Sequence, residues 1–166
     1  MTLRIEDKKR IVTEVAAIVA NAKSVVAAEY RGLTVEQLTS LRVGARKGGV
    51  YLRVVRNTLA RRAMEGTEFA CLSDALVGPL LLAFSREEPG AAPKLMSDFA
   101  KLNDRLIVKA GAYNGMLMLP ADLAKLAQLP TRDQAISLLM AVMKAPVGKL
   151  ARTLAAVRDQ KMAQAA

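Results

Sequence analysis

The chain of 166 residues is long enough for one domain with a substantial core and a short appended element, whereas two full domains would be a tight fit. Just over half of the residues are apolar and only 4% are aromatic, which argues against disorder throughout and requires a core of aliphatic side chains. The net charge of +10 favours a polyanionic partner (RNA, DNA or an anionic membrane), because lysines and arginines that meet phosphates release counterions.

The first part of the chain predicts a helix, a strand and a second helix. Residues 5–22 place their apolar side chains on one helical face, which indicates an amphipathic helix. The β-prone run 25–30 follows and predicts a strand. Thr34 and Gln37 then have capping-box spacing, so a helix is expected from there to about Lys47.

Strands and helices continue to alternate through the middle of the chain. Residues 50–55 alternate in polarity and predict a strand, after which Asn57 is expected to cap a third helix. Residues 76–84 and 106–113 predict two more strands, separated by a helix over 91–102. This alternation indicates an α/β fold in which helices pack on a mixed sheet.

A domain boundary is predicted at Pro130. A last short helix over residues 121–128 precedes this proline, and the residue before a proline disfavours the helical conformation. The predicted architecture is therefore a compact α/β domain over residues 1–130, followed by an extended helical tail over 131–166.

The tail is predicted to be one helical segment with an apolar stripe. Thr131 and Gln134 repeat the capping-box spacing, and no strand pattern follows. Such a stripe must either pack on the chain's own domain or bind a partner, and helical spacing alone leaves both readings open. The candidate anchors on it are Ile136, Leu139, Met140, Met143, Val147, Leu150, Leu154 and Val157.

Pro146 is expected to divide this stripe into two sets of four anchors. Proline lacks an amide proton and crowds the preceding turn of a helix, so a kink or break is predicted there. Each set spans three helical turns or fewer.

The sequence offers little for catalysis, metal binding or membrane insertion. It has no histidine, no Gly-x-Ser-x-Gly elbow and no phosphate-binding loop ending in Gly-Lys-Ser/Thr. Cys71 is the only cysteine, so neither an internal disulfide nor a zinc site is expected. The longest apolar run, residues 75–84, is about half a membrane span. A cytoplasmic protein that is not an enzyme and carries no cofactor is predicted.

The strongest local signal is a basic segment without any Asp or Glu. Residues 42–62 contain Arg42, Arg46, Lys47, Arg53, Arg56, Arg61 and Arg62. These could be ordinary solvated surface arginines, but the lack of neutralising carboxylates and the preference for arginine, whose planar guanidinium binds phosphate bidentately, favour RNA or DNA. Unpaired amides at the start of the helix near Asn57 would also attract an anion.

Taken together, these residues resemble the bacterial large-subunit ribosomal stalk-base protein, the L-ten family. The resemblance covers essentially the whole chain. Its specific pieces, in order, are 31–35 (RGLTV), 50–59 (VYLRVVRNTL), 77–79 (VGP), 89–92 (PGAA), 129–131 (LPT) and 149–159 (KLARTLAAVRD).

The resemblance implies an α/β domain bound to large-subunit ribosomal RNA beside another stalk-base protein. It also implies a mobile C-terminal helix that holds dimers of the acidic stalk protein, which recruit translation GTPases, and a capacity to repress translation of the chain's own messenger RNA. Together with the division at Pro146, this predicts two dimers per copy. The RNA contact is expected at Arg53, Arg56 and Asn57, with Arg31, Arg42, Arg46 and Arg61 around it.

Two other classes of function make different predictions. A DNA-binding regulator would use the helix after Asn57 for recognition, so duplex DNA would compete as well as ribosomal RNA. An enzyme would show turnover that disappears when one carboxylate is replaced.

Overall fold

The computed structural model describes residues 4–165. The backbone forms two compact units, Met1–Leu129 and Pro130–Ala166, which are described separately below as unit 1 and unit 2.

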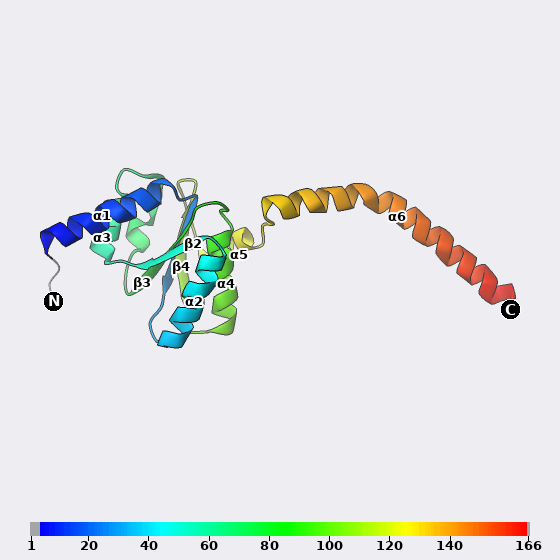
Figure 1. The fold of residues 1–166 in the computed structure, drawn as a ribbon, viewed down its shortest axis with the longest axis horizontal. Helices are drawn as coiled ribbons and strands as arrows, with labels where there is room; N and C mark the ends of the chain where they lie inside the picture. The colour runs from blue at the N-terminus through cyan, green and yellow to red at the C-terminus, as the bar shows by residue number, and fades with distance from the viewer. Residues whose placement is uncertain (1–3, 166) are drawn as a thin grey trace. The chain divides into compact units, whose positions relative to one another are not determined.

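Unit 1 alternates helices and strands along the chain (Figure 1). Its elements are α1 (Ile5–Ala20), β1 (Ser24–Glu29), α2 (Val35–Lys47), β2 (Val50–Val54), α3 (Asn57–Met64), the 3-10 helix η1 (Glu68–Ala75), β3 (Leu80–Ser85), α4 (Ala91–Leu102), β4 (Ile107–Tyr113), β5 (Met116–Met118) and α5 (Pro120–Ala127).

The strands form a five-stranded sheet in the order β2-β3-β1-β4-β5. Every pairing recorded among the described residues is antiparallel, so the sheet differs in this respect from the mixed sheet expected. Strand β1 lies at the centre, and its side chains from Ser24 to Ala28 are all buried. The small alanines of β1 allow helices to approach both of its faces.

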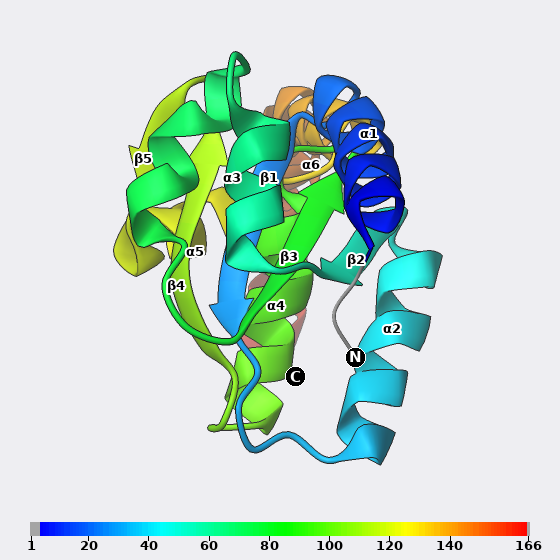
Figure 2. The ribbon, with the colours of Figure 1, turned by 90° about the vertical axis from the view of Figure 1, so that its left-hand side faces the viewer.

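Helices cover both faces of the sheet (Figure 2). On one face, Val25 and Ala27 pack with residues of α1, α3 and η1. On the other face, Val26 and Ala28 pack with residues of α2, α4 and α5. Successive side chains of a strand point to opposite faces, so β1 contributes to both halves of the core. The α/β fold class is thereby confirmed.

Two details of the predicted elements are wrong. Asn57 is the first residue of α3 and does not cap it, because Arg56 occupies the cap position and no side-chain cap bond forms. The third strand begins at Leu80, four residues later than expected, because Gly78 has a φ of +96° and Pro79 lacks the N–H that a strand ladder needs. The elements η1 and β5 have no counterpart among the predicted elements.

The capping boxes, in contrast, are confirmed. The Thr34 backbone N–H donates to Gln37 Oε1 at 2.9 Å, while the Gln37 N–H donates to Thr34 Oγ1 at 3.3 Å. Thr131 and Gln134 make the same reciprocal pair, at 3.2 and 3.4 Å. Each cap satisfies donors that a helix start leaves unpaired, an effect of about 1 kcal/mol.

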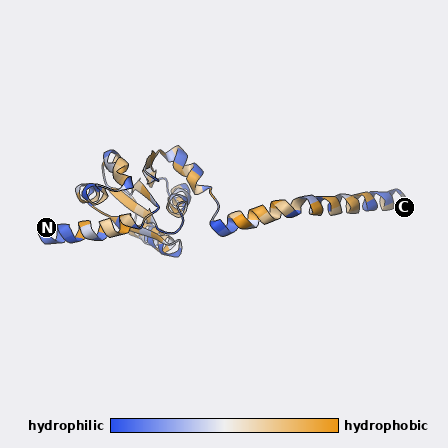
Figure 3. Cartoon of the chain, turned by 90° about the horizontal axis from the view of Figure 1, so that it is seen from above, coloured by the Kyte–Doolittle hydropathy of each residue, from blue (hydrophilic) through white to orange (hydrophobic). Residues whose placement is uncertain are grey.

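Unit 2 is a single helix, α6 (Arg132–Ala165). It continues through Pro146 without a break, and Figure 1 shows that it bends part-way along its length. Figure 3 shows a largely hydrophobic first part and an alternation of hydrophobic and hydrophilic residues further along. No helix among the described residues is long and apolar enough to cross a membrane.

Candidate nucleic-acid interface and partner-binding helix

A surface cleft of about 350 Å³ lies where three loops of unit 1 meet. Its walls come from the end of β1, from the turn between β2 and α3, and from the segment before β3. The lining residues are Tyr30, Val54, Val55, Arg56, Asn57, Thr58, Gly78, Pro79 and Leu80. We refer to it as the α3 cleft.

Helix α3 holds one wall of this cleft through three hydrogen bonds. The Asn57 side-chain amide donates to the Gly78 carbonyl oxygen at 2.9 Å. Arg61 donates from Nε to the Ser73 carbonyl oxygen at 3.0 Å and from Nη2 to the Leu76 carbonyl oxygen at 2.9 Å. Asn57 and Arg61, two of the predicted RNA contacts, therefore use side-chain N–H groups to hold the backbone segment that leads into β3.

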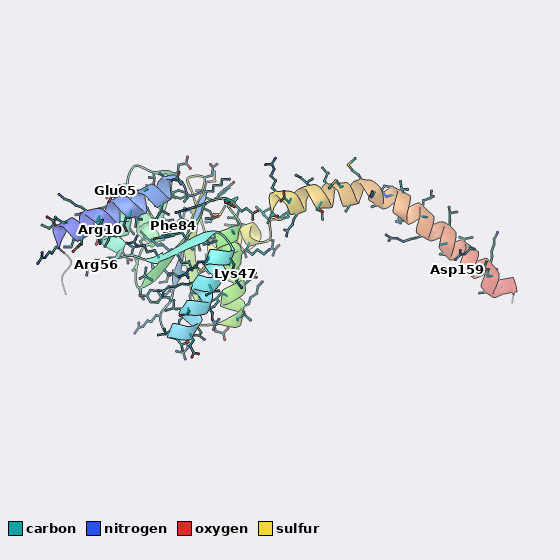
Figure 4. The ribbon with its side chains drawn as sticks, viewed as in Figure 1. Arg10, Lys47, Arg56, Glu65, Phe84 and Asp159 are labelled. Carbon is teal, nitrogen blue, oxygen red and sulfur yellow. The ribbon has the colours of Figure 1, made fainter. Side chains whose placement is uncertain are left out.

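Arg56 differs from Asn57 and Arg61 because its side chain is exposed, with no hydrogen bond or ion pair recorded within residues 4–165. It occupies the N-cap position of α3, and its carbonyl oxygen accepts the first backbone bonds of that helix, from Leu59 and Ala60. In the view of Figure 4 it lies at the edge of unit 1 where α1 begins, near the label of Arg10. The partial positive charge of the helix start adds to its guanidinium and favours an anion.

Arg53 is directed instead toward α1. Its Nη1 atom lies 2.8 Å from Glu14 Oε2 and 3.4 Å from the Tyr51 hydroxyl oxygen, and 28% of its side chain is exposed. The hydrogen bond to Glu14 raises the pKa of Arg53. This arginine is therefore paired within the domain. The ring of Tyr51 also makes a cation–π contact with a second arginine, because the guanidinium carbon of Arg86 lies 5.9 Å from the ring centre.

Arg42 and Arg46 meet in a second hollow, of about 400 Å³, between α2 and the edge strand β2. Both side chains are exposed, and their four-residue spacing places them on the same face of α2. Arg31 is exposed in the turn after β1, next to Tyr30 of the α3 cleft.

The structure thus brings some of the predicted RNA contacts together and separates the roles of others. Arg56 and Asn57 line one cleft, and Arg42 and Arg46 line another. Sequence reasoning missed Tyr30 and Arg86. Gly78 and Pro79 line the same cleft as Arg56. The motif at 77–79 marks these two residues in the sequence, but spacing along the chain does not reveal that they lie near Arg56.

The described residues offer no acidic, histidine or cysteine cluster for a metal ion, since no group of three such side chains comes together in them.

All eight predicted anchors on α6 are exposed, by 47% to 72%. Leu138 and Val142, outside the predicted stripe, are exposed by 64% and 61%, so the apolar surface of the first part is wider than one stripe. Between residues 134 and 143 the sequence has no charged residue, whereas basic residues lie among the anchors after Pro146. The helix consequently presents two apolar surfaces of different character.

Comparison with known proteins identifies relatives over nearly the full length of the chain. The family model described as ribosomal protein L10 matches residues 4–101, and that described as ribosomal protein uL10 C-terminal region matches residues 129–166. The large ribosomal subunit protein uL10 of Thioalkalivibrio sulfidiphilus is 60% identical, with 99% of this chain and 100% of the relative covered. The protein of that name from Aeromonas salmonicida is 58% identical, with the same coverage, and that from Methylococcus capsulatus is also 58% identical, with 98% and 99% covered.

Proposed function

The chain belongs to the ribosomal protein L10 family, and on that premise we propose that it forms the base of the large-subunit stalk in the cytoplasm. In this proposal unit 1 binds large-subunit ribosomal RNA beside a neighbouring stalk-base protein, and α6 carries dimers of the acidic stalk protein, which recruit translation GTPases. Relatives named as a ribosomal protein confirm the prediction that the chain is not an enzyme.

The observation that carries the RNA-binding part is the unpaired position of Arg56 at the start of α3, beside a cleft whose wall is held in place. A guanidinium next to open helix-start amides is suited to a phosphate group. The segment 42–62 around it has seven basic residues and no carboxylate of its own, and of these only Arg53 has an ion pair recorded among the described residues, with Glu14.

The predicted RNA contacts take three different roles in this proposal. Arg56 binds a phosphate directly, and Arg31, Arg42 and Arg46 extend the basic surface on either side. Asn57 and Arg61 position the wall of the α3 cleft through their bonds to Gly78, Ser73 and Leu76. Arg53 fixes α1 to β2 through Glu14. The same surface would bind the chain's own messenger RNA in translational repression.

Replacing Arg56 with Ala is expected to weaken binding to a large-subunit ribosomal RNA fragment and to flatten its salt dependence. Loss of one phosphate contact lowers the log–log slope of affinity against salt by roughly one unit. Filter binding or fluorescence anisotropy across a salt series measures both quantities. An unchanged slope, with the variant still folded, would remove Arg56 from the interface.

Arg61→Gln is the matched variant, because it also removes one positive charge from α3. Here we expect weaker binding with an unchanged slope, since Arg61 acts through the backbone of residues 73–76 and not through a phosphate. A urea unfolding curve on the same protein separates this effect from loss of stability. A slope that falls as it does for Arg56→Ala would place Arg61 in direct contact with RNA.

The whole proposal is tested by co-sedimentation with large ribosomal subunits. The full chain is expected to remain with washed subunits at low salt and to be released at high salt, because its contact is largely electrostatic. Release from washed subunits already at low salt would leave the proposed function without support.

The tail part of the proposal is supported by exposure and charge. The eight anchors are 47% to 72% exposed on a helix that is continuous through Pro146. The tail also carries more basic than acidic residues, which would steer an acidic partner toward it. These are Arg132, Lys144, Lys149, Arg152, Arg158 and Lys161 against Asp133 and Asp159.

A further inference from the structure

A third hollow of unit 1, of about 480 Å³, lies between α1 and α3 and shares no lining residue with the α3 cleft. It is lined by Ile5, Lys8, Lys9, Val12, Thr13, Leu59 and Arg62. We call it the α1–α3 groove.

The groove follows one face of each helix. The α1 residues that line it are three, four, seven and eight positions after Ile5, the spacing that places side chains along one side of a helix. On α3, Leu59 and Arg62 are separated by three positions. Helices α1 and α3 pack against each other, and Leu59 and Val12 belong to or border the core beneath. The floor is therefore held in place before any partner arrives.

That floor is aliphatic and partly open to water. Ile5, at one end of it, is 71% exposed, while Val12 and Leu59 supply the remaining apolar surface. A single exposed isoleucine needs no explanation, but here it continues a surface that is concave and apolar. Covering such a surface releases the water that hydrates it, which favours binding.

The rim of the groove is basic. Lys8, Lys9 and Arg62 border the floor, and no carboxylate occurs among the described residues that line it. The part of the groove formed by described residues has no aromatic side chain on which a base could stack, and leucine, valine and isoleucine side chains offer a nucleotide no hydrogen bond. An aliphatic floor with cations beside it is complementary to aliphatic side chains flanked by carboxylates, which points to protein and away from RNA.

We propose that the α1–α3 groove docks an acidic amphipathic helix of a protein partner. The apolar face of that helix covers Ile5, Val12 and Leu59, and its glutamates or aspartates pair with Lys8, Lys9 and Arg62. None of its lining residues belongs to the α3 cleft or to α6, so this proposal does not depend on the function proposed for either.

The test uses the full chain and two synthetic fluorescein-labelled peptides. One is a helical peptide with leucines on one face and glutamates beside them, and its sister has lysines in place of the glutamates. Fluorescence anisotropy is expected to show saturable binding of the acidic peptide only. In the double variant Lys9→Glu/Arg62→Glu, binding of the acidic peptide should weaken by about tenfold, and the basic peptide should now bind.

The matched control is Lys149→Glu/Arg152→Glu, which makes the same change of charge on α6, where exposed anchors could also attract the peptide. Affinity for the acidic peptide should be unchanged in this control. Equal weakening in both double variants would mean that only net charge matters, and weakening in the α6 variant alone would place the peptide on the tail. Either result overturns the proposal.

Ile5→Ser tests the apolar floor without altering charge. Because Ile5 is 71% exposed, this substitution should leave the stability of the domain unchanged. Ile5→Ser should weaken binding of the acidic peptide severalfold. The affinity for RNA and the salt dependence of RNA binding should not change. A fall in RNA affinity would assign the groove to RNA. Sedimentation in which the unmodified chain is a dimer and Ile5→Ser is a monomer would assign it to a second copy of the chain. Both outcomes contradict docking of a partner helix.

Discussion

A chain that ends at Pro130 is expected to fold and to bind ribosomal RNA with the affinity of the full chain, but to retain none of the acidic stalk dimers. Both halves of the hydrophobic core consist of residues of unit 1, up to Leu123 of α5. The two faces of the sheet are therefore covered without any residue of α6. All eight candidate anchors for the dimers are lost with α6.

Two measurements check this expectation on the same preparation. Filter binding gives the RNA affinity, and size-exclusion chromatography after co-expression shows whether the acidic protein travels with the chain. Circular dichroism and a thermal melt establish that the truncated chain is folded. Loss of RNA affinity in a folded, truncated chain would show that the tail belongs to the RNA interface, and retention of the dimers would place their site on unit 1.

The second expectation concerns the number of partner chains that α6 holds. Full-length protein is expected to carry four acidic chains, as two dimers, and a chain truncated after Lys144 is expected to carry two. Pro146 lies between the two sets of anchors, and a proline within a helix weakens its hydrogen bonding and bends it. Burial of the four exposed apolar side chains of one set would contribute several kcal/mol of binding free energy, at about 25 cal/mol per Å² of apolar surface. The cost of ordering the partners is subtracted from this gain.

Native mass spectrometry of the co-expressed complexes counts the chains directly. The truncation after Lys144 keeps Ile136, Leu139, Met140 and Met143 and removes the other four anchors. Six acidic chains on the full-length protein, or none on the truncated protein, would show that Pro146 does not divide the binding surface. A Pro146→Ala variant that still carries four chains would show that the anchors, and not the bend, set the number.

Most of the fold can be predicted from the sequence because its signals are local. The boxes at Thr34 and Thr131 fix where two helices start, and period-two or helical spacing identifies β2 and α4. The sequence predicts too early a start for β3 because residues 76–79 are mostly apolar, while a positive φ at Gly78 and the proline at 79 keep them out of the ladder. The pairing of strands is a long-range property, so local patterns do not predict the antiparallel order of the sheet.

The sequence predicts which segment holds the candidate site, but it does not predict what each arginine in that segment does. The acid-free run of arginines identifies a candidate segment, but an arginine free to bind a phosphate and one that binds a backbone carbonyl look the same in sequence. Arg61 reaches the backbone of residues 73–76, and Arg53 reaches Glu14, across distances along the chain that no spacing rule covers. Only the fold reveals that Arg56 is the arginine left unpaired at the start of α3.

The uneven distribution of charge along α6 has a consequence for how the proposed stalk would exchange its parts. The anchors before Pro146 lie in a segment without charges, so a dimer held there depends on apolar contact and is insensitive to ionic strength. The anchors after Pro146 lie among Lys149, Arg152 and Arg158, so attraction of an acidic dimer there is screened by salt. The two dimers would then differ in residence time. The distal one would leave first as salt rises and would be replaced more often, while the proximal one would stay bound for longer.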